Sequence, residues 1–345
     1  MLGDVERLGS NDMENRPDRP GPAPLLSVRD LSIDFVTRHG SVRALDRVSF
    51  DMAPGEILGL VGESGAGKSL SGNAIIGLID PPGRIAAGEI LLEGRRTDTL
   101  APREMRKLRG RSIAAIFQDP LTSLDPLMRV GDQIAETILT HLPLTRRQAR
   151  ERALELLRAV GIPAPELRID HYPHQFSGGM RQRVVIALAL CADPKLIIAD
   201  EPTTALDVSI QAQIISLLKT MCREHQTAIL LVTHDMGVIA EAADRVAVMY
   251  AGRLVEIGPV EEVLRAPKHV YTAGLIGSIP SLNRRRERLV QINGAMPRPG
   301  SVPPGCPFAP RCPKRIDKCA ERPELLPIGN SHAACWRAGE GHSYA

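Results

Sequence analysis

Short apolar segments alternate with polar ones along most of the chain, and their lengths predict both strands and helices. Over residues 26–50, apolar and polar positions alternate around a turn at 39–40, which is typical of antiparallel strands. Continuous apolar runs at 57–61, 196–199 and 228–232 have the length of buried strands in a parallel sheet. The pattern therefore predicts two kinds of sheet in one chain.

Between these strands lie segments whose apolar residues recur at helical spacing. Strands that alternate with helices predict a mostly parallel sheet with helices on both faces, and the helices are expected at 69–78, 184–190 and 210–222. Apolar residues at helical spacing also fill 127–159, with a break near Leu142 and Pro143. We expect an inserted helical subdomain at about 120–190.

The two ends of the chain differ in composition from the middle. Residues 1–24 are rich in proline and charge, so we expect a disordered lead-in, with Met1 and Met13 both open as the start. Proline, arginine and glycine become frequent after residue 258. We expect a linker and a small appended segment at 259–345, where the pattern indicates no particular helix or strand. RRRER at 284–288 is expected to be a solvated linker, with a local basic patch as the alternative.

Composition excludes some classes of protein. The net charge of +3 over 345 residues gives no indication of a chain that coats nucleic acid. No apolar run approaches the roughly 18 to 20 residues that a membrane span requires, so we expect a soluble chain that reaches a membrane only through a partner. Without an export signal, the six cysteines are expected to be reduced thiols or metal ligands.

A phosphate-binding loop follows the first buried strand and opens the first predicted helix. The pattern G-x-x-x-x-G-K-S is matched by Gly62, Glu63, Ser64, Gly65, Ala66, Gly67, Lys68 and Ser69. Small residues let successive N–H groups point at an anion, and the helix N-terminus adds positive potential. We expect Lys68 to neutralise the β and γ phosphates of a nucleotide and Ser69 to ligate Mg²⁺.

Two carboxylates, Asp200 and Glu201, follow the apolar run 196–199. The end of a buried strand places Asp200 near the metal, where it can hold Mg²⁺ directly or through water. Glu201, one residue later, can polarise the water that attacks the γ-phosphate. A phosphate loop alone leaves GTPases, kinases and other NTPases open, so the downstream motifs decide among them.

The sequence Ser177-Gly178-Gly179 before a predicted helix resembles the signature motif of the ABC ATPase family. Physically it is a second anion site, because a hydroxyl and two glycines let N–H groups at a helix start approach a phosphate. The resemblance implies a P-loop NTPase (RecA-like) α/β core over 25–258, with an antiparallel β subdomain and the inserted α-helical subdomain. It also implies that the signature of one subunit closes over ATP held by the P-loop of a second ABC ATPase subunit.

Further motifs of the family follow in order. Gln118 resembles the Q-loop residue, Asp207 in ALD at 205–207 the D-loop residue, and His234 the switch histidine. The resemblance implies that Gln118 offers its carbonyl to Mg²⁺ or to the attacking water, and that His234 donates to the γ-phosphate. Phe35 lies where family members stack an aromatic ring on adenine, and a core-packing role for it stays open.

Longer stretches resemble the oligopeptide, dipeptide and nickel branch of ABC import systems. They are FQDPLTSLDPLMRVGDQIAE, PHQFSGGMRQRV, ADEPTTALDVSIQAQI and HVYTAGLIGSIP. This resemblance spans about residues 26–338. It implies an ATPase peripheral to the cytoplasmic face of the cell (inner) membrane that energises peptide uptake with two permease subunits and, indirectly, a solute-binding protein. The helical subdomain around 118–139 would bind a coupling helix of a permease.

Some alternatives stay open. Nickel or glutathione-like solutes fit the same branch, and so does either a homodimer or a heterodimer. A soluble ABC ATPase acting on nucleic acid is disfavoured because the P-loop-to-signature interval lacks sustained heptads, and we expect no nucleic-acid partner. A regulatory module that binds ATP without turnover is disfavoured by the intact Glu201 and His234.

Four cysteines lie near the C-terminal end, namely Cys306, Cys312, Cys319 and Cys335. Four soft ligands can crosslink a loop-rich segment through a metal. No C-x-x-C pair of the kind usual for zinc is present, and prolines follow Cys306 and Cys312, as at some iron–sulfur ligands. The import-branch resemblance implies a [4Fe–4S] cluster, with zinc and ordinary thiols as alternatives. Cys191 and Cys222 are expected to pack in the core.

Overall fold

The structure, a computed structural model, describes residues 23–38, 40–204, 206–278 and 291–340. Most of the expected lead-in at 1–24, with Met1 and Met13, lies outside these ranges. The same holds for Ala205 of the D-loop and for RRRER at 284–288. Among the described residues, no helix combines the length and the apolar character that a membrane crossing requires.

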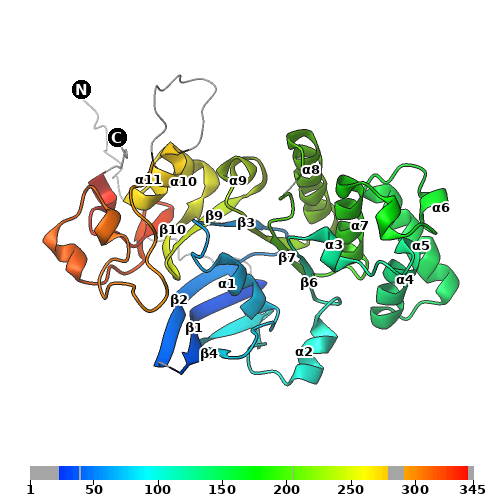
Figure 1. Ribbon diagram of the computed structural model, residues 1–345, viewed down its shortest axis with the longest axis horizontal. Helices are drawn as coiled ribbons and strands as arrows, with labels where there is room; N and C mark the ends of the chain where they lie inside the picture. The colour runs from blue at the N-terminus through cyan, green and yellow to red at the C-terminus, as the bar shows by residue number, and fades with distance from the viewer. Residues whose placement is uncertain (1–22, 39, 205, 279–290, 341–345) are drawn as a thin grey trace, which may run out of the picture.

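The N-terminal strands form an antiparallel sheet, as their alternating pattern predicted. Its order is β2-β1-β4-β5, and its strands are β1 (Leu26–Thr37), β2 (Gly40–Met52), β4 (Gly83–Leu92) and β5 (Arg95–Arg96). β1 pairs with both β2 and β4. Apolar side chains on one face of β1, such as Leu26, Val28 and Ile33, are fully buried or nearly so and face the core. This sheet lies below the centre of the molecule in Figure 1.

The larger sheet has eight strands within the described residues, in the order β11-β12-β10-β9-β3-β8-β7-β6. The three predicted buried strands are confirmed and lie side by side in parallel. The bounds of the strands are β3 (Ile57–Val61), β6 (Ile113–Ile116), β7 (Leu196–Asp200), β8 (Ala228–Val232), β9 (Arg245–Tyr250), β10 (Arg253–Pro259), β11 (Leu326–Ile328) and β12 (Ser331–Ala333).

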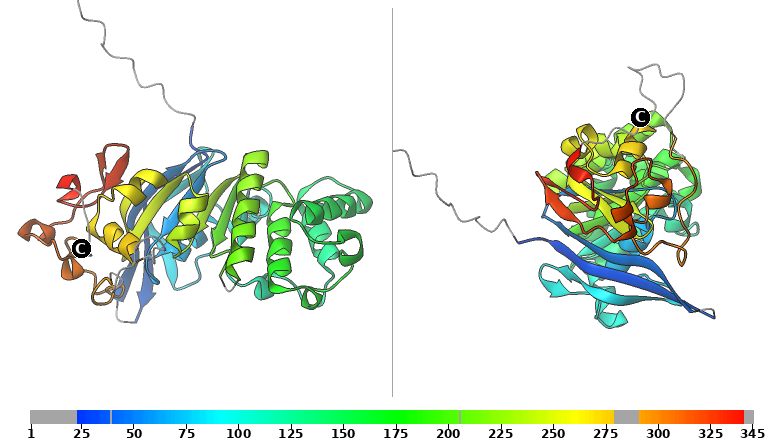
Figure 2. Two further views of the ribbon diagram at one scale, coloured as in Figure 1. Left: turned by 90° about the horizontal axis from the view of Figure 1, so that it is seen from above. Right: turned by 90° about the vertical axis from the view of Figure 1, so that its left-hand side faces the viewer.

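Helices cover this sheet and also form a separate lobe. The covering helices include α1 (Lys68–Ile75), α8 (Val208–His225) and α9 (Met236–Ala242), while α2 (Pro102–Leu108) lies beside the antiparallel sheet. The lobe holds α3 (Pro120–Ser123), α4 (Val130–His141), α5 (Arg146–Ala159), α6 (Pro165–Arg168) and α7 (Gly178–Leu190). It projects to the right in Figure 1, and Figure 2 shows it at the opposite end from the C-terminal segment.

The break predicted near Leu142 and Pro143 separates α4 from α5. The second helix begins with a capping box: the Thr145 side chain accepts from the Gln148 amide, and the Gln148 side chain accepts from the Thr145 amide. This reciprocal pair satisfies two amides that a helix start leaves without partners. The chain therefore turns back on itself at this point, and α4 packs against α5.

The C-terminal segment contains regular structure that the sequence pattern did not indicate. It contains α10 (Val260–Arg265), α11 (Val270–Gly277) and the hairpin β11–β12. β12 pairs with β10 through Glu256↔Ala333 and Ile257↔His332, so the hairpin continues the large sheet. Strands of three residues are too short to show a period, and their conformation depends on pairing with β10.

Strand β3 lies between two hydrophobic clusters. Ile57 and Val61 belong to the cluster that includes the helical lobe and Phe308 of the C-terminal segment. Leu58 and Leu60 belong to the cluster under the antiparallel sheet. Because successive side chains of a strand point to opposite faces, β3 is buried on both sides. The loop that follows Val61 therefore starts from a firmly packed strand.

Candidate active site

The phosphate loop runs from the end of β3 to the start of α1 and needs its glycines. Gly62, Gly65 and Gly67 have φ values of 154°, 81° and 105°. A Cβ atom at Gly62 would lie 2.3 Å from the Met249 carbonyl oxygen, and one at Gly67 would lie 2.5 Å from the Leu45 side chain. Only glycine fits this close approach.

Lys68 lies at the start of α1 with its ammonium folded back onto the loop. Its Nζ donates to the carbonyls of Gly62 at 2.8 Å and Glu63 at 3.1 Å. Burial lowers the pKa of Lys68, and the nearby carboxylates of Glu201 and Asp200 act in the opposite direction. An incoming phosphate would offer this ammonium better acceptors than two neutral carbonyls. The rest of the loop leaves Ser64, Gly65 and Ser69 exposed, while Ala66 is buried.

Ser69 in the first turn of α1 faces Asp200 at the end of β7. The Ser69 Oγ donates to Asp200 Oδ1 at 3.0 Å. Burial raises the pKa of Asp200, while the hydrogen bond from Ser69 and the charge of Lys68 offset part of that effect. Oxygen donors beside a phosphate loop suit Mg²⁺, which commonly takes one or two protein ligands together with phosphate oxygens. Within the described residues, no three His, Cys, Asp or Glu side chains are grouped to hold an ion.

Glu201 gathers three polar side chains around its carboxylate. Oε2 accepts from Gln118 Nε2 at 3.0 Å and from Thr204 Oγ1 at 2.8 Å, and Oε1 lies 2.9 Å from His234 Nδ1. These residues come from the ends of β6, β7 and β8, which are neighbours in the sheet. The cluster therefore forms at the carboxyl ends of parallel strands, where open α/β sheets bind ligands.

The electrostatics of Glu201 keep it ionised. Burial acts to raise its pKa, but hydrogen bonds from His234 and Thr204 and the charges of His234 and Lys68 outweigh it, so the pKa is lowered. Its backbone has φ of 47°, in the left-handed region that costs a non-glycine residue free energy. Its amide nevertheless donates to the Val232 carbonyl at 2.8 Å. The neighbouring strand thus holds the strained residue in place.

The signature residues lie apart from the phosphate loop of the same chain. Ser177 caps α7 by accepting from the Met180 amide at 3.3 Å, and it is exposed together with Gly178. A Cβ at Gly179 would lie 2.8 Å from Ile210 near the start of α8. In Figure 1, α7 belongs with the helical lobe, away from α1. Asp207, the residue before α8, is also exposed. A Cβ at Gly178 would lie 4.0 Å from the side chain of Leu206, so the signature lies beside the D-loop.

Phe35 lies on β1 opposite Val42 and Gly83 and is half-buried. A Cβ at Gly83 would lie 2.9 Å from its ring, so the ring packs closely on this backbone. It is also in contact with the hydrophobic cluster under the antiparallel sheet. The structure thus combines a packing role with a partly exposed ring surface.

The four C-terminal cysteines line one small cavity of about 20 Å³, together with His269 and Phe308. The six cysteines all lie within the described residues and form no disulfide there. Burial raises the pKa of Cys306 to about 11, and the nearby Cys319, Cys335 and Cys312 act in the same direction. Cys191 and Cys222 are each 1 % exposed within the core, which confirms their predicted packing role.

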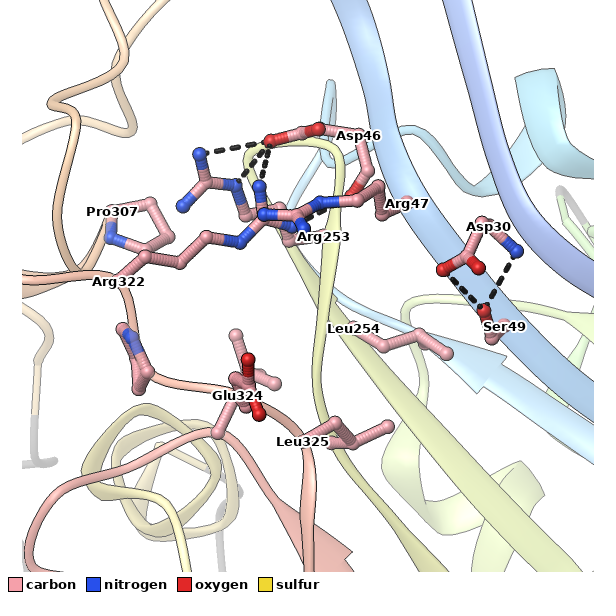
Figure 3. A pocket seen from close by; sticks show the side chains of 13 residues that line it. Asp30, Asp46, Arg47, Ser49, Arg253, Leu254, Pro307, Arg322, Glu324 and Leu325 are labelled. Atoms are coloured by element: carbon pink, nitrogen blue, oxygen red, sulfur yellow. Dashed lines mark hydrogen bonds and ion pairs between the residues drawn. The ribbon is translucent and has the colours of Figure 1, made fainter. Parts of the chain in front are cut away.

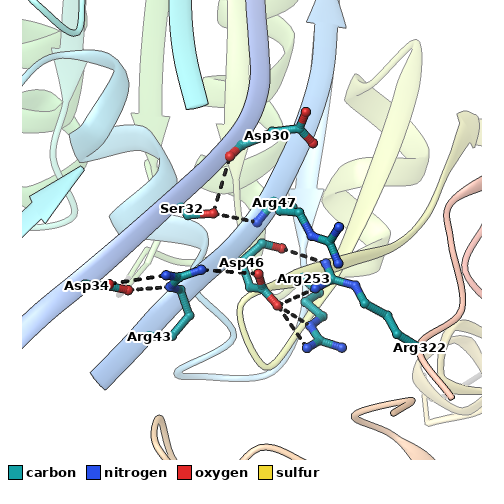
Figure 4. A network of polar contacts seen from close by, with 8 residues as sticks. All are labelled: Asp30, Ser32, Asp34, Arg43, Asp46, Arg47, Arg253 and Arg322. Atoms are coloured by element: carbon teal, nitrogen blue, oxygen red, sulfur yellow. Dashed lines mark hydrogen bonds and ion pairs between the residues drawn. The ribbon is translucent and has the colours of Figure 1, made fainter. Parts of the chain in front are cut away.

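Asp46 on β2 fastens the C-terminal segment to the antiparallel sheet. It accepts from Arg253 at 2.9 Å and from Arg322 at 2.7 Å, and both arginines line a cavity of about 310 Å³ between these parts (Figure 3). Figure 4 shows the same contacts extending to Arg43, which pairs with Asp34. The segment is therefore attached to the ATPase core by charge as well as by sheet pairing.

Sequence reasoning missed three residues at the phosphate-binding end. Thr204 contacts Glu201, and Arg311 and Tyr271 contact Glu63 of the loop. The TT of ADEPTT placed Thr204 near the site without indicating the direction of its side chain. Arg311 gave no signal apart from its position beside Cys312.

Comparisons with known proteins agree with this geometry. The family described as ABC transporter matches residues 45–204, and the oligopeptide/dipeptide transporter C-terminal region matches residues 255–319. The dipeptide transport ATP-binding protein DppD of Bacillus subtilis is 48% identical over 315 residues, which cover 90% of this chain and 94% of that protein. The oligopeptide transport ATP-binding protein OppD of the same organism is 50% identical over 312 residues, which cover 89% and 87%.

A solved structure carries the same fold. The dimeric ATP-binding cassette MJ0796, in a post-hydrolysis state with ADP and Pi, superposes with a TM-score of 0.62 at 29% identity. The match covers 68% of this chain and 98% of that one. The predicted P-loop NTPase fold is thereby confirmed, and with it the ATPase activity that the motifs indicated. The chain belongs to the ATP-binding subunits of the ABC transporter family, in its oligopeptide and dipeptide transporter branch.

Proposed function

We propose that this chain binds and hydrolyses ATP at the end of β3 and thereby energises peptide uptake through two membrane permease subunits. It would act as one of two ATPase subunits at the cytoplasmic face of the cell membrane. The observation that carries the proposal is the Glu201 carboxylate, held by Gln118, Thr204 and His234. Lys68 contributes positive charge to the same site. An ionised carboxylate held in one orientation at this position suits activation of water.

Binding is proposed to begin at the phosphate loop. Lys68 would exchange the carbonyls of Gly62 and Glu63 for β and γ phosphate oxygens, and the loop amides and the start of α1 would hold the remaining charge. Ser69 and Asp200 would hold Mg²⁺, which would neutralise negative charge on the β and γ phosphates. The raised pKa of Asp200 reflects the cost of an ionised carboxylate in a buried place, and a cation removes that cost.

Hydrolysis is proposed to depend on Glu201 and its neighbours. Glu201 would accept a hydrogen bond from the attacking water and orient it towards the γ-phosphorus. His234, now within 2.9 Å of Glu201, would turn its N–H to the γ-phosphate, and Gln118 would turn to the metal or the water. The strained backbone of Glu201 keeps the carboxylate directed into the site.

A second ATPase subunit would complete each site. Ser177, Gly178 and Asp207 are exposed, and Val208 is 83 % exposed next to the D-loop. Exposed apolar side chains beside an anion-binding helix start suit a protein interface. The surface would close over ATP on the partner's phosphate loop. The same surface serves a homodimer or a heterodimer.

The helical lobe would bind the permease. Phe117, Leu121 and Leu127 are 42 %, 59 % and 85 % exposed around the Q-loop and α3. A groove of about 480 Å³ lies along α4 and α5, with Leu139 in its wall. Large exposed apolar side chains and a groove on the same helical lobe each favour docking of an apolar or amphipathic helix. A coupling helix of the permease is the proposed occupant.

Peptide is the proposed solute because the relatives carry dipeptide and oligopeptide transport names. A solute-binding protein on the far side of the membrane would deliver it to the permeases. Nickel or glutathione-like solutes are the alternative within the same branch. The cysteines and phosphate loop described above do not contact the solute in this scheme.

We further propose that Cys306, Cys312, Cys319 and Cys335 hold a [4Fe–4S] cluster. Support comes from the single cavity that all four line and from the mutual effect of their charges on the Cys306 pKa. Within the described residues, no three His, Cys, Asp or Glu side chains are grouped to hold a metal ion, so the proposal rests on the softness of four thiol ligands in one loop-rich segment, and zinc is the alternative metal. The cluster would crosslink a loop-rich segment. Iron and sulfide analysis of anaerobically purified protein tests this, and finding neither would exclude the cluster.

The function is tested by ATPase activity of the purified chain, alone and after reconstitution with membrane subunits from the same organism. Stimulation by those subunits, abolished by Glu201→Gln, is the expected result. Stimulation only by DNA or RNA would instead favour a soluble ABC ATPase acting on nucleic acid.

A further inference from the structure

The phosphate loop is contacted by the C-terminal segment through a partly buried ion pair. Arg311 Nη1 donates to both carboxylate oxygens of Glu63, at 3.0 and 3.1 Å. The Arg311 side chain is 7 % exposed and the Glu63 side chain 29 %. Glu63 is the second residue of the loop, so the pair joins the ATP-binding end of the core to a residue 248 positions later.

The guanidinium of Arg311 is held on several sides. Its Nε donates to the Asn293 carbonyl at 2.8 Å, and Nη2 donates to the Ile292 carbonyl at 3.3 Å. The same group lies 5.8 Å from the centre of the Tyr250 ring. A guanidinium with this many fixed partners is presented to Glu63 in one orientation.

The backbone of Glu63 is held from the same side. Its amide donates to the Tyr271 hydroxyl at 2.9 Å. Its carbonyl accepts from the Ala66 amide at 3.1 Å and from Lys68 Nζ at 3.1 Å. Glu63 is therefore the residue where contacts from the C-terminal segment meet the contacts that shape the loop.

An aromatic cluster connects these contacts to the core. The rings of Tyr250 and Tyr271 lie 4.6 Å apart, and Phe308 lies 5.3 Å from Tyr250 and 5.4 Å from Tyr271. The Arg311 amide donates to the Phe308 carbonyl at 2.9 Å, so the buried Phe308 fixes the turn from which Arg311 extends. The arginine is thus positioned by packing within the folded core.

The negative charge of Glu63 matters because the loop to which it belongs has to bind a polyanion. An unpaired carboxylate next to the phosphate oxygens would repel them and would leave the start of the loop less constrained. Arg311 neutralises this carboxylate and holds it in place. Opposite charges at hydrogen-bond distance in a partly buried site interact strongly enough to affect binding.

We infer that Arg311 is a positioning residue for ATP binding, which acts by neutralising and fixing Glu63 of the phosphate loop. The inference rests on ATP binding at this loop, as proposed above. It places part of the control of nucleotide affinity in the segment that follows the ATPase core. The residue does not touch the reacting atoms, so it should affect affinity more than turnover.

The test measures ATP affinity and steady-state ATPase parameters of the full chain. Arg311→Ala is expected to raise the Kd for ATP about tenfold, while kcat at saturating ATP stays within about twofold of wild type. Arg311→Lys keeps the positive charge but not the two parallel N–H donors of the guanidinium, so its Kd for ATP should rise about threefold. The control is Arg315→Ala, an exposed arginine four residues later on the same segment, which should leave the Kd unchanged.

A double variant separates electrostatics from simple damage to the segment. Glu63→Gln in the Arg311→Ala background removes the unpaired charge, so the Kd should recover to within about threefold of wild type. An Arg311→Ala protein with the same Kd as Arg315→Ala would overturn the inference, and so would a double variant no better than Arg311→Ala. Wild-type protein that binds no ATP would instead refute the proposed function.

Discussion

The phosphate-binding end of the large sheet and its C-terminal edge are built from the same sheet but by different means. At the first, β3, β6, β7 and β8 are adjacent, and the polar residues that follow them meet around Glu201. At the second, the three-residue strands β11 and β12 are added to β10. The candidate catalytic residues therefore lie where adjacent parallel strands end, whereas the C-terminal edge is held by short strand pairing and individual ion pairs.

The burial of charge follows the same division. The phosphate-binding end holds three partly buried ionisable groups, Lys68, Asp200 and Glu201. Their pKa values are shifted by burial and by each other's charges, as is common for groups that take part in binding or catalysis. In the C-terminal segment, Arg311 and Arg322 are instead paired with carboxylates of the core, Glu63 and Asp46. The comparison predicts that substitutions at the phosphate-binding end reduce ATP hydrolysis or direct ATP binding. Substitutions at the C-terminal edge should instead reduce stability, or reduce ATP affinity indirectly through Arg311.

The largest expected effect is at Glu201. Glu201→Gln should lower kcat by at least about a hundredfold, because a neutral amide cannot orient the attacking water as a carboxylate does. Its Kd for ATP should remain within about threefold of wild type. Steady-state hydrolysis and equilibrium nucleotide binding measure the two parameters. Glu224→Gln, an exposed glutamate on α8, is the matched control, and equal activity of the two variants would refute the role of Glu201.

Lys68→Ala should act on binding before chemistry. The lost charge-assisted contacts to phosphate are expected to raise the Kd for ATP about ten- to a hundredfold. Equilibrium titration with ATP measures this. Lys107→Ala, on the exposed face of α2, should bind like wild type. A Lys68→Ala protein with unaltered affinity would show that the phosphates bind elsewhere.

The ionised carboxylate of Asp200 is expected to destabilise the folded protein when no metal is bound. Its folded-state pKa is raised by burial, so the unfolded state ionises first and stability falls as the pH rises from the unfolded pKa through the folded one. Asp200→Asn should therefore raise the Tm of metal-free protein by about 2 °C at pH 7.5 and leave it almost unchanged at pH 3.

With Mg²⁺ and ATP present, wild-type protein should have a higher Tm than Asp200→Asn, since only the carboxylate binds the cation well. Thermal unfolding at both pH values, with and without Mg²⁺ and ATP, gives the comparison. A metal-free Asp200→Asn protein less stable than wild type at pH 7.5 would contradict the account.

The smallest effect on turnover is expected at the cysteine end. Cys306→Ser should lower the Tm by about 2 to 4 °C, because a buried thiol that lines the shared cavity is replaced. The kcat should stay within about twofold of wild type. Scanning calorimetry and ATPase assays of anaerobically purified protein test both expectations. A large loss of kcat with an unchanged Tm would mean that the cysteine end takes part in the reaction.

Local patterns were sufficient to predict much of the ATPase core. The run 57–61 followed by the glycine-rich loop predicted β3, the loop and α1, because both the strand and the helix start are specified by neighbouring residues. The break at Leu142 and Pro143 was equally local. The family resemblance supplied Gln118 and His234, whose meeting at Glu201 depends on the order of β6, β7 and β8.

Contacts between distant segments were not predictable in this way. Arg311 and Glu63 are 248 positions apart, and neither has a periodic or motif signal that joins them. The hairpin β11–β12 takes its register from β10, through residues that pair across about seventy-five positions of the chain, which no local pattern encodes. The left-handed backbone of Glu201 was also invisible in the sequence, because it results from surrounding packing.

Coupled transport tests the central claim most directly. Peptide uptake and ATP hydrolysis would be measured together in vesicles that contain the permeases, the solute-binding protein and either wild-type chain or Glu201→Gln. The account predicts that wild-type chain supports both and that Glu201→Gln abolishes both while still binding ATP. Peptide uptake that continues at the wild-type rate with Glu201→Gln would contradict it.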